Sequence, residues 1–350
     1  MVECQAMTLR AAVMGMLLGF APVLAPGVAF AAPAGPQRVC GIGDKRLVEI
    51  SGLVATSGGY VVVNDGSEDK DRRRIFFLDR KCSVTRTVSY PSRPRDTEDL
   101  ALGADGTLWV ADIGDNSLTR DTIGLWKLAP GAKSPKLYRL AYPDAPHNAE
   151  ALLLTPAGTP IVVTKAEVGE AAALYVPDGG LSAKGTTPLR RVGTVTLPLT
   201  GTSNPFSLPG RMLVTGGAVR ADGRRVVLRT YADAFEFDVS DGDVVAALTA
   251  GTPRTVALPD EPQGESIAYS VDGTTLLTVS EVADQPPGTE ADLLSYPLAT
   301  ASPAALPSPA SAAVERDGMP PSLLVAAGLL LVGVAGTIGA ITARRARRRG

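Results

Sequence analysis

One unit recurs five times along the chain and constrains the fold more than any other feature. Each copy holds a polar residue, a short apolar strand, a tight turn ending in glycine and a second apolar strand. The turn glycines follow one another at intervals of 47, 52, 65 and 50 residues. Repeats of about this length, built from short strands, are typical of β-propeller blades. The copies are ISGLVATSGGYVVVND (50–65), TEDLALGADGTLWVAD (97–112), NAEALLLTPAGTPIVVT (148–164), VTGGAVRADGRRVVLRT (214–230) and GESIAYSVDGTTLLTVS (264–280).

Further strands are expected after each of these hairpins. A third strand is predicted at 74–78, 124–128, 172–176, 234–238 and 292–296, and a fourth at 85–90, 136–141, 189–197 and 254–258. We therefore expect an all-β propeller of four-stranded antiparallel blades, with no helical periodicity between residues 40 and 298.

The number of blades and the closure of the ring depend on two segments. Five blades are preferred, and six are the alternative, because the longest interval has room for another unit around 202–210. The loop-like sequence of 204–210 favours five. The last unit lacks a fourth strand, so residues 38–42 are expected to supply it and to leave no open sheet edge.

The two ends of the chain predict export and a membrane anchor. Residues 1–31 have a basic residue, an apolar run and an Ala-Phe-Ala end, as a signal peptide does. Residues 322–343 form an uncharged apolar run long enough to cross a bilayer. Five arginines in the tail, 344–350, place that end in the cytoplasm. Residues 32–298 would be the propeller outside the membrane, and the Pro/Ala/Ser-rich 299–321 its stalk.

Cysteine usage and charge agree with export. Removal of the leader takes Cys4 and leaves Cys40 and Cys82, which we expect to form a disulfide. Without leader and tail, 28 basic residues remain against 35 acidic ones, so the exported part carries a charge of about −7. That charge disfavours nucleic acid and anionic lipid as partners.

A polar ring is predicted at one mouth of the central channel. The residue eight positions before each turn glycine begins a first strand, and the end of the second strand returns to the same sheet edge. The strand starts are Ser51, Glu98, Glu150, Thr215 and Glu265; the strand ends are Asp65, Asp112, Thr164, Thr230 and Ser280; nearby lie Lys165, Arg229, Tyr231, Glu281 and His147.

Two interpretations of the ring stay open. Its polar groups could simply satisfy one another across neighbouring blades. Alternatively, Glu98, Glu150, Glu265 and Asp112 would hold a cation such as Ca²⁺, because carboxylates gathered at one place repel unless they are paired, protonated or bridged. A single histidine excludes a multi-histidine zinc site, and no Gly-x-Ser-x-Gly elbow is present.

Three phrases carry a family resemblance. TEDLALGADGTLWVADIGDN, PHNAEALLLTPAGTPIVVTK and EPQGESIAYSVDGTTLLTVSE resemble a family of exported, membrane-anchored actinobacterial β-propellers of unassigned activity, over about residues 38–298. More distantly, the chain is similar to the "esterase-like activity of phytase" group and to propellers of the gluconolactonase and paraoxonase type. The latter resemblance implies a Ca²⁺ at the channel mouth, with Glu98, Glu150 and Asp112 as the nearest candidates, whereas Ser51 and Thr215 depart from the acidic pattern.

Two functions follow as hypotheses. The first is a surface binding module for a cell-envelope ligand, a small molecule or a protein, with Ser51, Asp65, Lys165, Arg229, Tyr231 and Glu281 at the mouth. The second is a metal-assisted hydrolase of lactones, esters or phosphoesters, in which the four acidic residues hold Ca²⁺ and His147 is the base.

Overall fold

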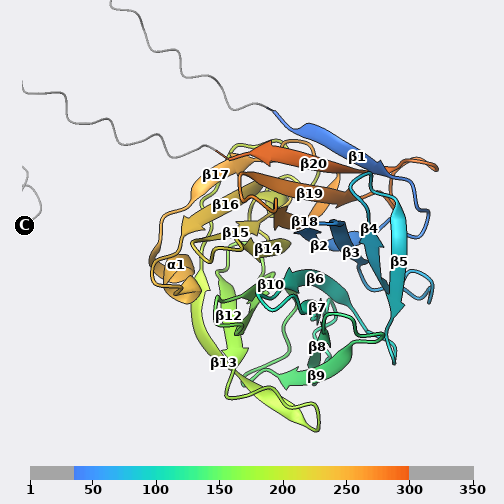
Figure 1. The fold of residues 1–350 in the computed structure, drawn as a ribbon. Coiled ribbons are helices and arrows are strands. Elements are labelled where there is room, and N and C mark those ends of the chain that lie inside the picture. The colour runs from blue at the N-terminus through green and yellow to red at the C-terminus, as the bar shows by residue number, and fades with distance from the viewer. Residues whose placement is uncertain (1–34, 299–350) are drawn as a thin grey trace, which may run out of the picture. The chain divides into compact units, whose positions relative to one another are not determined.

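The computed structural model describes residues 35–298, which form a β-propeller-like arrangement of sheets around a centre (Figure 1). The strands are β1 (Gln37–Ile42), β2 (Ile50–Thr56), β3 (Gly59–Asn64), β4 (Arg74–Leu78), β5 (Val84–Ser89), β6 (Thr97–Leu102), β7 (Leu108–Asp112), β8 (Ile123–Leu128), β9 (Lys136–Ala141), β10 (Ala149–Leu154), β11 (Pro160–Thr164), β12 (Ala172–Pro177), β13 (Thr186–Val195), β14 (Gly216–Val219), β15 (Arg225–Arg229), β16 (Asp233–Asp238), β17 (Arg254–Ala257), β18 (Gln263–Tyr269), β19 (Thr275–Glu281) and β20 (Ala291–Pro297).

The sheets follow the predicted repeat. Three have four antiparallel strands, in the orders β2-β3-β4-β5, β14-β15-β16-β17 and β18-β19-β20-β1. The fourth has eight strands and consists of two antiparallel halves, β6–β9 and β10–β13, joined by a parallel pairing of β13 with β9. The first strands β2, β6, β10, β14 and β18 contact one another in a closed circle, so their side chains surround the centre.

The turn glycines have the backbone conformation that tight hairpins demand. Gly106, Gly158, Gly223 and Gly273 all have φ between 69° and 79°, and Gly59 has φ of 145°. A side chain at Gly59 would in addition place its Cβ 2.1 Å from the Leu78 carbonyl oxygen. At the turn end of these hairpins, the strand ends and turns of all five repeats line a cavity of about 640 Å³. The first strands begin at the opposite end of the ring.

Apolar side chains fill the spaces between neighbouring units. Alternate residues of one strand face opposite sides, so Val61 and Val63 pack toward β6–β8, whereas Val62 packs toward β18–β20. This burial on both faces explains why β3 is a continuous apolar run rather than an alternating one. Stacked sheets of this kind hold the first strands rigidly around the centre.

The N-terminal strand closes the ring as predicted. β1 pairs antiparallel with β20, and it lies outermost in that sheet (Figure 1). The predicted disulfide between Cys40 and Cys82 is present and spans 42 residues of chain. It links the added strand β1 to the segment between β4 and β5, which belongs to the neighbouring sheet.

Loss of this disulfide is expected to destabilise the protein by about 2–4 kcal/mol, because the bond restricts the unfolded chain. Chemical unfolding of a Cys40→Ser/Cys82→Ser variant measures the effect. Reductant should lower the stability of the wild-type protein by a similar amount and leave the variant unchanged. Equal unfolding midpoints for variant and wild type would contradict the expectation.

One helix was not predicted. Helix α1 (Val244–Ala250) begins at Asp243, whose carboxylate accepts a 2.9 Å hydrogen bond from the Ala246 amide, and it packs Val244 and Leu248 into the core. Its seven residues combine three alanines and a leucine, which favour helix, with two valines and a threonine, which favour strands, and so short a helix depends on tertiary packing. Residues 202–208 form no strand, and the short 3-10 helix η1 (Pro209–Arg211) follows them.

The predicted signal peptide, stalk, membrane span and tail lie outside the described residues. Within 35–298, no helix is long and apolar enough to cross a membrane.

Candidate functional site

A β-bulge marks the ring position in four of the five repeats. The pairing of the first two strands shifts register around Ser51, Glu98, Glu150 and Glu265, each of which is passed over in its ladder. A bulge leaves one residue outside the regular pairing and redirects its side chain. The repeat therefore places a non-ladder side chain at the same end of each of these first strands.

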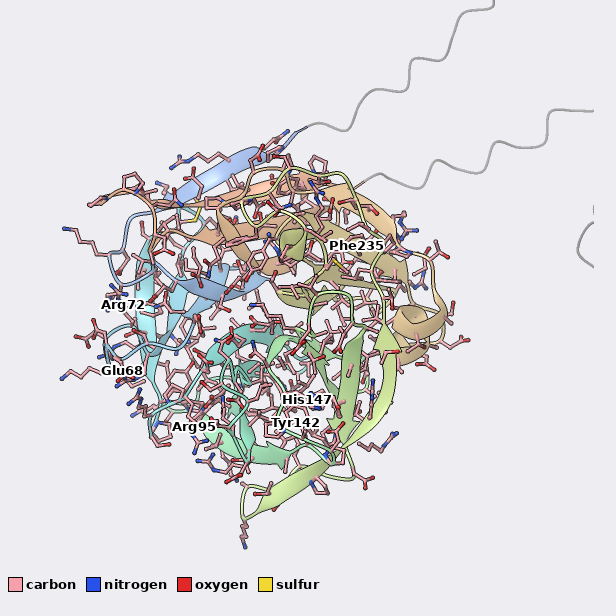
Figure 2. All side chains as sticks on the ribbon, turned by 180° about the vertical axis from the view of Figure 1, so that it is seen from behind. Glu68, Arg72, Arg95, Tyr142, His147 and Phe235 are labelled. Atoms are coloured by element: carbon pink, nitrogen blue, oxygen red, sulfur yellow. A yellow bond between two sulfur atoms is a disulfide. The ribbon has the colours of Figure 1, made fainter. Side chains whose placement is uncertain are left out.

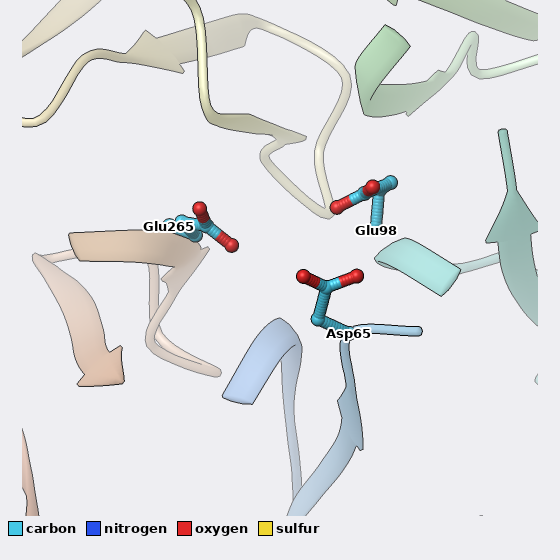
Figure 3. Close-up of side chains that lie close together, drawn as sticks. All are labelled: Asp65, Glu98 and Glu265. Carbon is cyan, nitrogen blue, oxygen red and sulfur yellow. The ribbon is translucent and has the colours of Figure 1, made fainter. Parts of the chain in front are cut away.

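Three carboxylates meet at the end of the ring where the first strands begin. We call them the acidic cluster: Asp65, Glu98 and Glu265. One oxygen of each lies within 4.8 Å of the others. They come from three different sheets and point toward a common space (Figure 3). Glu98 and Glu265 are buried, and Asp65 is partly exposed.

Glu265 is only half satisfied. Its Oε1 accepts hydrogen bonds from the Tyr231 hydroxyl at 3.3 Å and from Gln263 Nε2 at 3.4 Å. Its Oε2 is buried and has no hydrogen-bond donor among residues 35–298, and the same holds for Glu281 Oε1. Unpaired buried oxygens are costly, and they commonly mark a missing proton, water or ion. Glu281 is close enough to share a proton with Glu265, so the unpaired oxygens call for either a shared proton or a cation at the acidic cluster.

Burial and mutual repulsion disfavour the charged forms of Asp65, Glu98 and the neighbouring Glu281. Burial, with Glu265 and Asp96 nearby, raises the pKa of Asp65 to about 9. Burial and then Glu150 hold the pKa of Glu98 well above its usual range. Burial, followed by Glu265, raises the pKa of Glu281 to about 11. Without a cation, Asp65 and Glu98 therefore retain protons at neutral pH.

Lys165 supplies positive charge beside the acidic cluster. Its Nζ lies 3.0 Å from Glu150 Oε1 and 3.1 Å from the Tyr231 hydroxyl. Asn148 Nδ2 donates a second hydrogen bond to Glu150 Oε1, at 3.0 Å. Burial raises the pKa of Glu150 while Lys165 opposes this, and the result is a pKa of about 7. Glu150 is thus tied to a lysine rather than grouped with the three cluster carboxylates.

The different turn lengths explain why Asp65 joins the cluster and Asp112 does not. Each of these two aspartates lies six residues after its turn glycine, so the sequence predicts the same position for both. In the structure Ile50 pairs with Asn64, and Thr97 pairs with Asp112, so Asp112 corresponds to Asn64. Asp65 lies one residue further along, and one residue changes the face that a side chain occupies.

Asp112 instead braces a loop and the neighbouring strands. Its carboxylate accepts hydrogen bonds from the Arg95 and Asp96 amides, from Arg120 at 2.9 Å and from the Trp126 indole at 3.2 Å. These contacts use both oxygens. Asp112 was predicted to hold a cation together with Glu98 and Glu265. In the structure it lies outside their cluster.

Arg229 is likewise a structural residue. It is fully buried, and its guanidinium contacts Glu261 Oε2 at 3.1 Å and the Ser266 carbonyl at 2.9 Å. Thr278 and Tyr296 hydrogen-bond to the other oxygen of Glu261, each at 2.7 Å. This satisfied network joins β15 to the last repeat and leaves Arg229 no role at the mouth.

His147 lies in a separate group of side chains. Its Nε2 lies 3.1 Å from Asp144 Oδ1 and 2.9 Å from the Tyr175 hydroxyl, and its ring meets that of Tyr142 edge-on at 4.9 Å (Figure 2). None of its hydrogen-bond partners within 35–298 is a carboxylate of the acidic cluster. The structure thus places the predicted base away from the three carboxylates.

The two ring positions without an acid have structural roles. The Ser51 hydroxyl donates to the Glu98 carbonyl, and Thr215 Oγ1 donates to the Gly264 carbonyl at 3.0 Å. Each hydroxyl therefore ties one first strand to the next. At these two positions the polar groups hydrogen-bond across neighbouring blades, as the first interpretation of the ring predicts.

Sequence reasoning missed some residues that shape the site. Asp96 and Gln263 stand two residues before the ring glutamates Glu98 and Glu265, and Asn148 has the same place before Glu150. That shared offset is a signal that was present in the repeat. Asp96 is close enough to Asp65 to influence its pKa.

Gly114 is needed because it lies against two of these carboxylates. A Cβ at this position would sit 2.0 Å from Glu98 Oε1 and 2.5 Å from Asp96 Oδ2. Both atoms are ends of side chains, so Gly114→Ala should displace the carboxylates rather than prevent folding. Any Ca²⁺ held by the acidic cluster should then bind roughly tenfold or more weakly, as measured by calorimetry, since Ca²⁺ sites depend on ligand placement. Gly180→Ala, with open space around it, is the control; unchanged affinity in Gly114→Ala would contradict the placement.

Comparisons with known proteins find distant likenesses among solved structures, and these carry no argument here. No protein-family model matches the chain, and no curated protein does. Among solved structures, the PQQ-bound aldose sugar dehydrogenase of Streptomyces coelicolor is similar with a TM-score of 0.40 and 12% identity, covering 76% of this chain and 99% of that one. A gluconolactonase of Xanthomonas campestris is similar with a TM-score of 0.40 and 17% identity, covering 71% and 72%. At these values the likeness carries no argument about activity.

Proposed function

We propose that the chain is a five-bladed propeller whose acidic cluster binds a divalent cation, preferably Ca²⁺, and that it hydrolyses an ester, lactone or phosphoester at this site. One observation carries the proposal. Asp65, Glu98 and Glu265 bring three carboxylates within 4.8 Å, and Glu265 Oε2 is buried without a hydrogen-bond partner in the described part of the chain.

The donor set suits Ca²⁺. All three ligands are carboxylates, which hard cations prefer, and Ca²⁺ binds oxygen at about 2.3–2.6 Å. Two oxygens on opposite sides of such an ion are therefore about 4.6–5.2 Å apart, which accommodates the cluster. Mg²⁺ binds at about 2.0–2.1 Å and demands nearly octahedral geometry, so it fits the wider separations less well.

Different residues of the site would bind the cation and orient its ligands. Asp65, Glu98 and Glu265 hold the cation, and Tyr231 and Gln263 orient Glu265 through its Oε1. When bound, a divalent cation supplies Lewis-acid polarisation of a carbonyl or phosphoryl oxygen. Burial of Glu98 and Glu265 keeps the surroundings of low polarity, which strengthens that polarisation. No observation on residues 35–298 favours the binding-module hypothesis.

Export and anchoring remain part of the proposal. The sequence of residues 1–31 and 322–343 supports an exported propeller on a single membrane span, with the C-terminus in the cytoplasm. The Cys40–Cys82 disulfide supports an oxidising compartment. The proposed partner is a small molecule or another component of the cell envelope, and no nucleic acid.

Turnover assays with the purified protein test the reaction. A panel of lactones, carboxylic esters and phosphoesters is assayed with Ca²⁺ and after removal of divalent ions by a chelator. We expect hydrolysis of at least one class, its loss with chelator and its recovery with added Ca²⁺. Cation binding without turnover of any class would contradict the hydrolase, and turnover that is indifferent to chelation would contradict the role of the cation.

A further inference from the structure

Lys165 has more donor hydrogens than its hydrogen-bond partners in the described part of the chain accept. Its ammonium has three donor hydrogens. Among the described residues, Glu150 Oε1 and the Tyr231 hydroxyl are its hydrogen-bond partners. The side chain is 19% exposed, whereas that of Glu150 is 3% exposed. The lysine is therefore fixed at its tip and still reaches solvent at the mouth, with donor capacity to spare.

Tyr231 connects this lysine to the acidic cluster. The tyrosine hydroxyl lies 3.1 Å from Lys165 Nζ and donates to Glu265 Oε1 at 3.3 Å. Phe206 covers the Tyr231 ring, with the ring centres 4.4 Å apart, and so fixes the orientation of the hydroxyl. A ligand atom bound at the cluster would thus have a lysine as a close neighbour.

We infer that Lys165, positioned by Tyr231, binds the substrate oxygen on which negative charge develops during hydrolysis. The inference rests on the proposed function and names a further catalytic residue for it. The substrate then presents a carbonyl or phosphoryl oxygen that lies between the cation and the lysine. Donors fixed in advance at the place where charge develops are among the strongest contributions to catalysis.

The charge of the lysine is secure. Burial lowers the pKa of Lys165, but Glu150, Tyr231 and Glu265 outweigh it, and the pKa lies above its ordinary value. Among Asp65, Glu98, Glu150, Glu265 and Glu281, the one salt bridge within residues 35–298 joins Glu150 to Lys165. A cation bound at the acidic cluster places positive charge near the lysine, so cation and anion should each strengthen binding of the other.

A purely structural role for Lys165 makes different predictions. The lysine could serve only to compensate the buried charge of Glu150, since removing one partner of a buried pair is strongly destabilising. In that case its loss should affect stability and should not discriminate between anionic and neutral ligands. The paired variant Glu150→Gln/Lys165→Met removes both charges, and it keeps the test meaningful if Lys165→Met alone fails to fold.

Binding of two small probes to the full-length protein tests the inference by calorimetry. Phenylphosphonate carries a tetrahedral anion like that formed during ester hydrolysis, and benzamide is a neutral ligand of similar size. We expect phenylphosphonate to bind at least about tenfold more tightly with Ca²⁺ than without it. Lys165→Met and the paired variant should weaken phenylphosphonate at least about tenfold and benzamide less than about threefold, whereas Lys165→Arg should keep part of the affinity.

Kinetics on a hydrolysed substrate provide the second readout. Lys165→Met should lower kcat by about a hundredfold with a smaller change in KM, as expected for an interaction made mainly in the transition state. Lys127→Met is the matched control, because Lys127 packs over the Trp109 ring at 4.0 Å in another part of the propeller. Its kcat should equal that of wild type.

The outcomes separate the inference from the proposed function. Lys165-dependent, Ca²⁺-dependent phosphonate binding without any turnover would contradict the hydrolase and support the anion-binding role. Ca²⁺-dependent turnover with wild-type kcat and phosphonate affinity in the Lys165 variants would overturn the inference alone. Absence of phosphonate binding to the Ca²⁺-loaded wild-type protein would overturn it as well.

Discussion

Glu265→Gln is expected to lower the affinity for Ca²⁺ by roughly a hundredfold or more, because the affinity of such sites depends on the number of charged ligands. The substitution replaces a carboxylate by a neutral amide of nearly the same shape. Tyr231 and Gln263 donate to Oε1, so the glutamine should keep its carbonyl oxygen there and place its amide NH2, which does not ligate a cation, at the position of Oε2. Calorimetric titration of Ca²⁺ into the purified variant measures the loss.

Further variants make this expectation specific. Asp65→Asn and Glu98→Gln should each weaken binding to a similar extent, because all three oxygens meet at one point. Glu170→Gln, at an exposed position, is the control and should bind Ca²⁺ as wild type does. If the three cluster variants also kept wild-type affinity, the cation would have to bind elsewhere.

Binding of Ca²⁺ is expected to strengthen steeply as the pH rises toward 9. Burial, with Glu265 nearby, raises the pKa of Asp65 to about 9, so this carboxyl holds a proton at neutral pH in the ion-free protein. A cation must displace that proton, and each displaced proton changes the affinity by up to about tenfold per pH unit. Calorimetry between pH 6 and 9, in buffers of different ionisation enthalpy, measures the affinity and the number of protons released.

The stability of the ion-free protein should change in the opposite direction. The pKa of Asp65 is raised in the folded state above its unfolded value of 3.8. Its contribution to stability is therefore fully present below pH 3.8 and is lost progressively as the pH rises through about 9. Asp65→Asn should remove this part of the pH dependence. A Ca²⁺ affinity that is constant from pH 6 to 9, with no proton release, would contradict the coupling.

The fold could be predicted in most of its detail because each repeat unit carries its own local signals. The turn glycines, the alternating packing and the unpaired edge of the last unit all specify local geometry that sequence displays. The closing strand β1 followed from the missing fourth strand of the last unit, and the Cys40–Cys82 bond from the cysteine count and the export signal. Helix α1 did not, since its stability comes from packing against the sheets rather than from its own composition.

The site could be predicted only in part, because its membership depends on a register of one residue. The structure brings together Glu98 and Glu265 of the predicted ring, and it links Lys165 to Glu265 through Tyr231. The first hairpin is one residue shorter than the second, so Asn64 takes the place of Asp112 and Asp65 reaches the cluster. No rule of spacing reveals that Arg229 is neutralised by Glu261, which lies 32 residues further along the chain.

A crystal structure of the protein grown with Ca²⁺ tests the cation site most directly. Anomalous scattering identifies the ion independently of its surroundings. We expect a Ca²⁺ bound by Asp65, Glu98 and Glu265, at about 2.3–2.6 Å from an oxygen of each. A cluster without an ion at saturating Ca²⁺ and pH 8, with the carboxyls hydrogen-bonded to one another or to water, would contradict it.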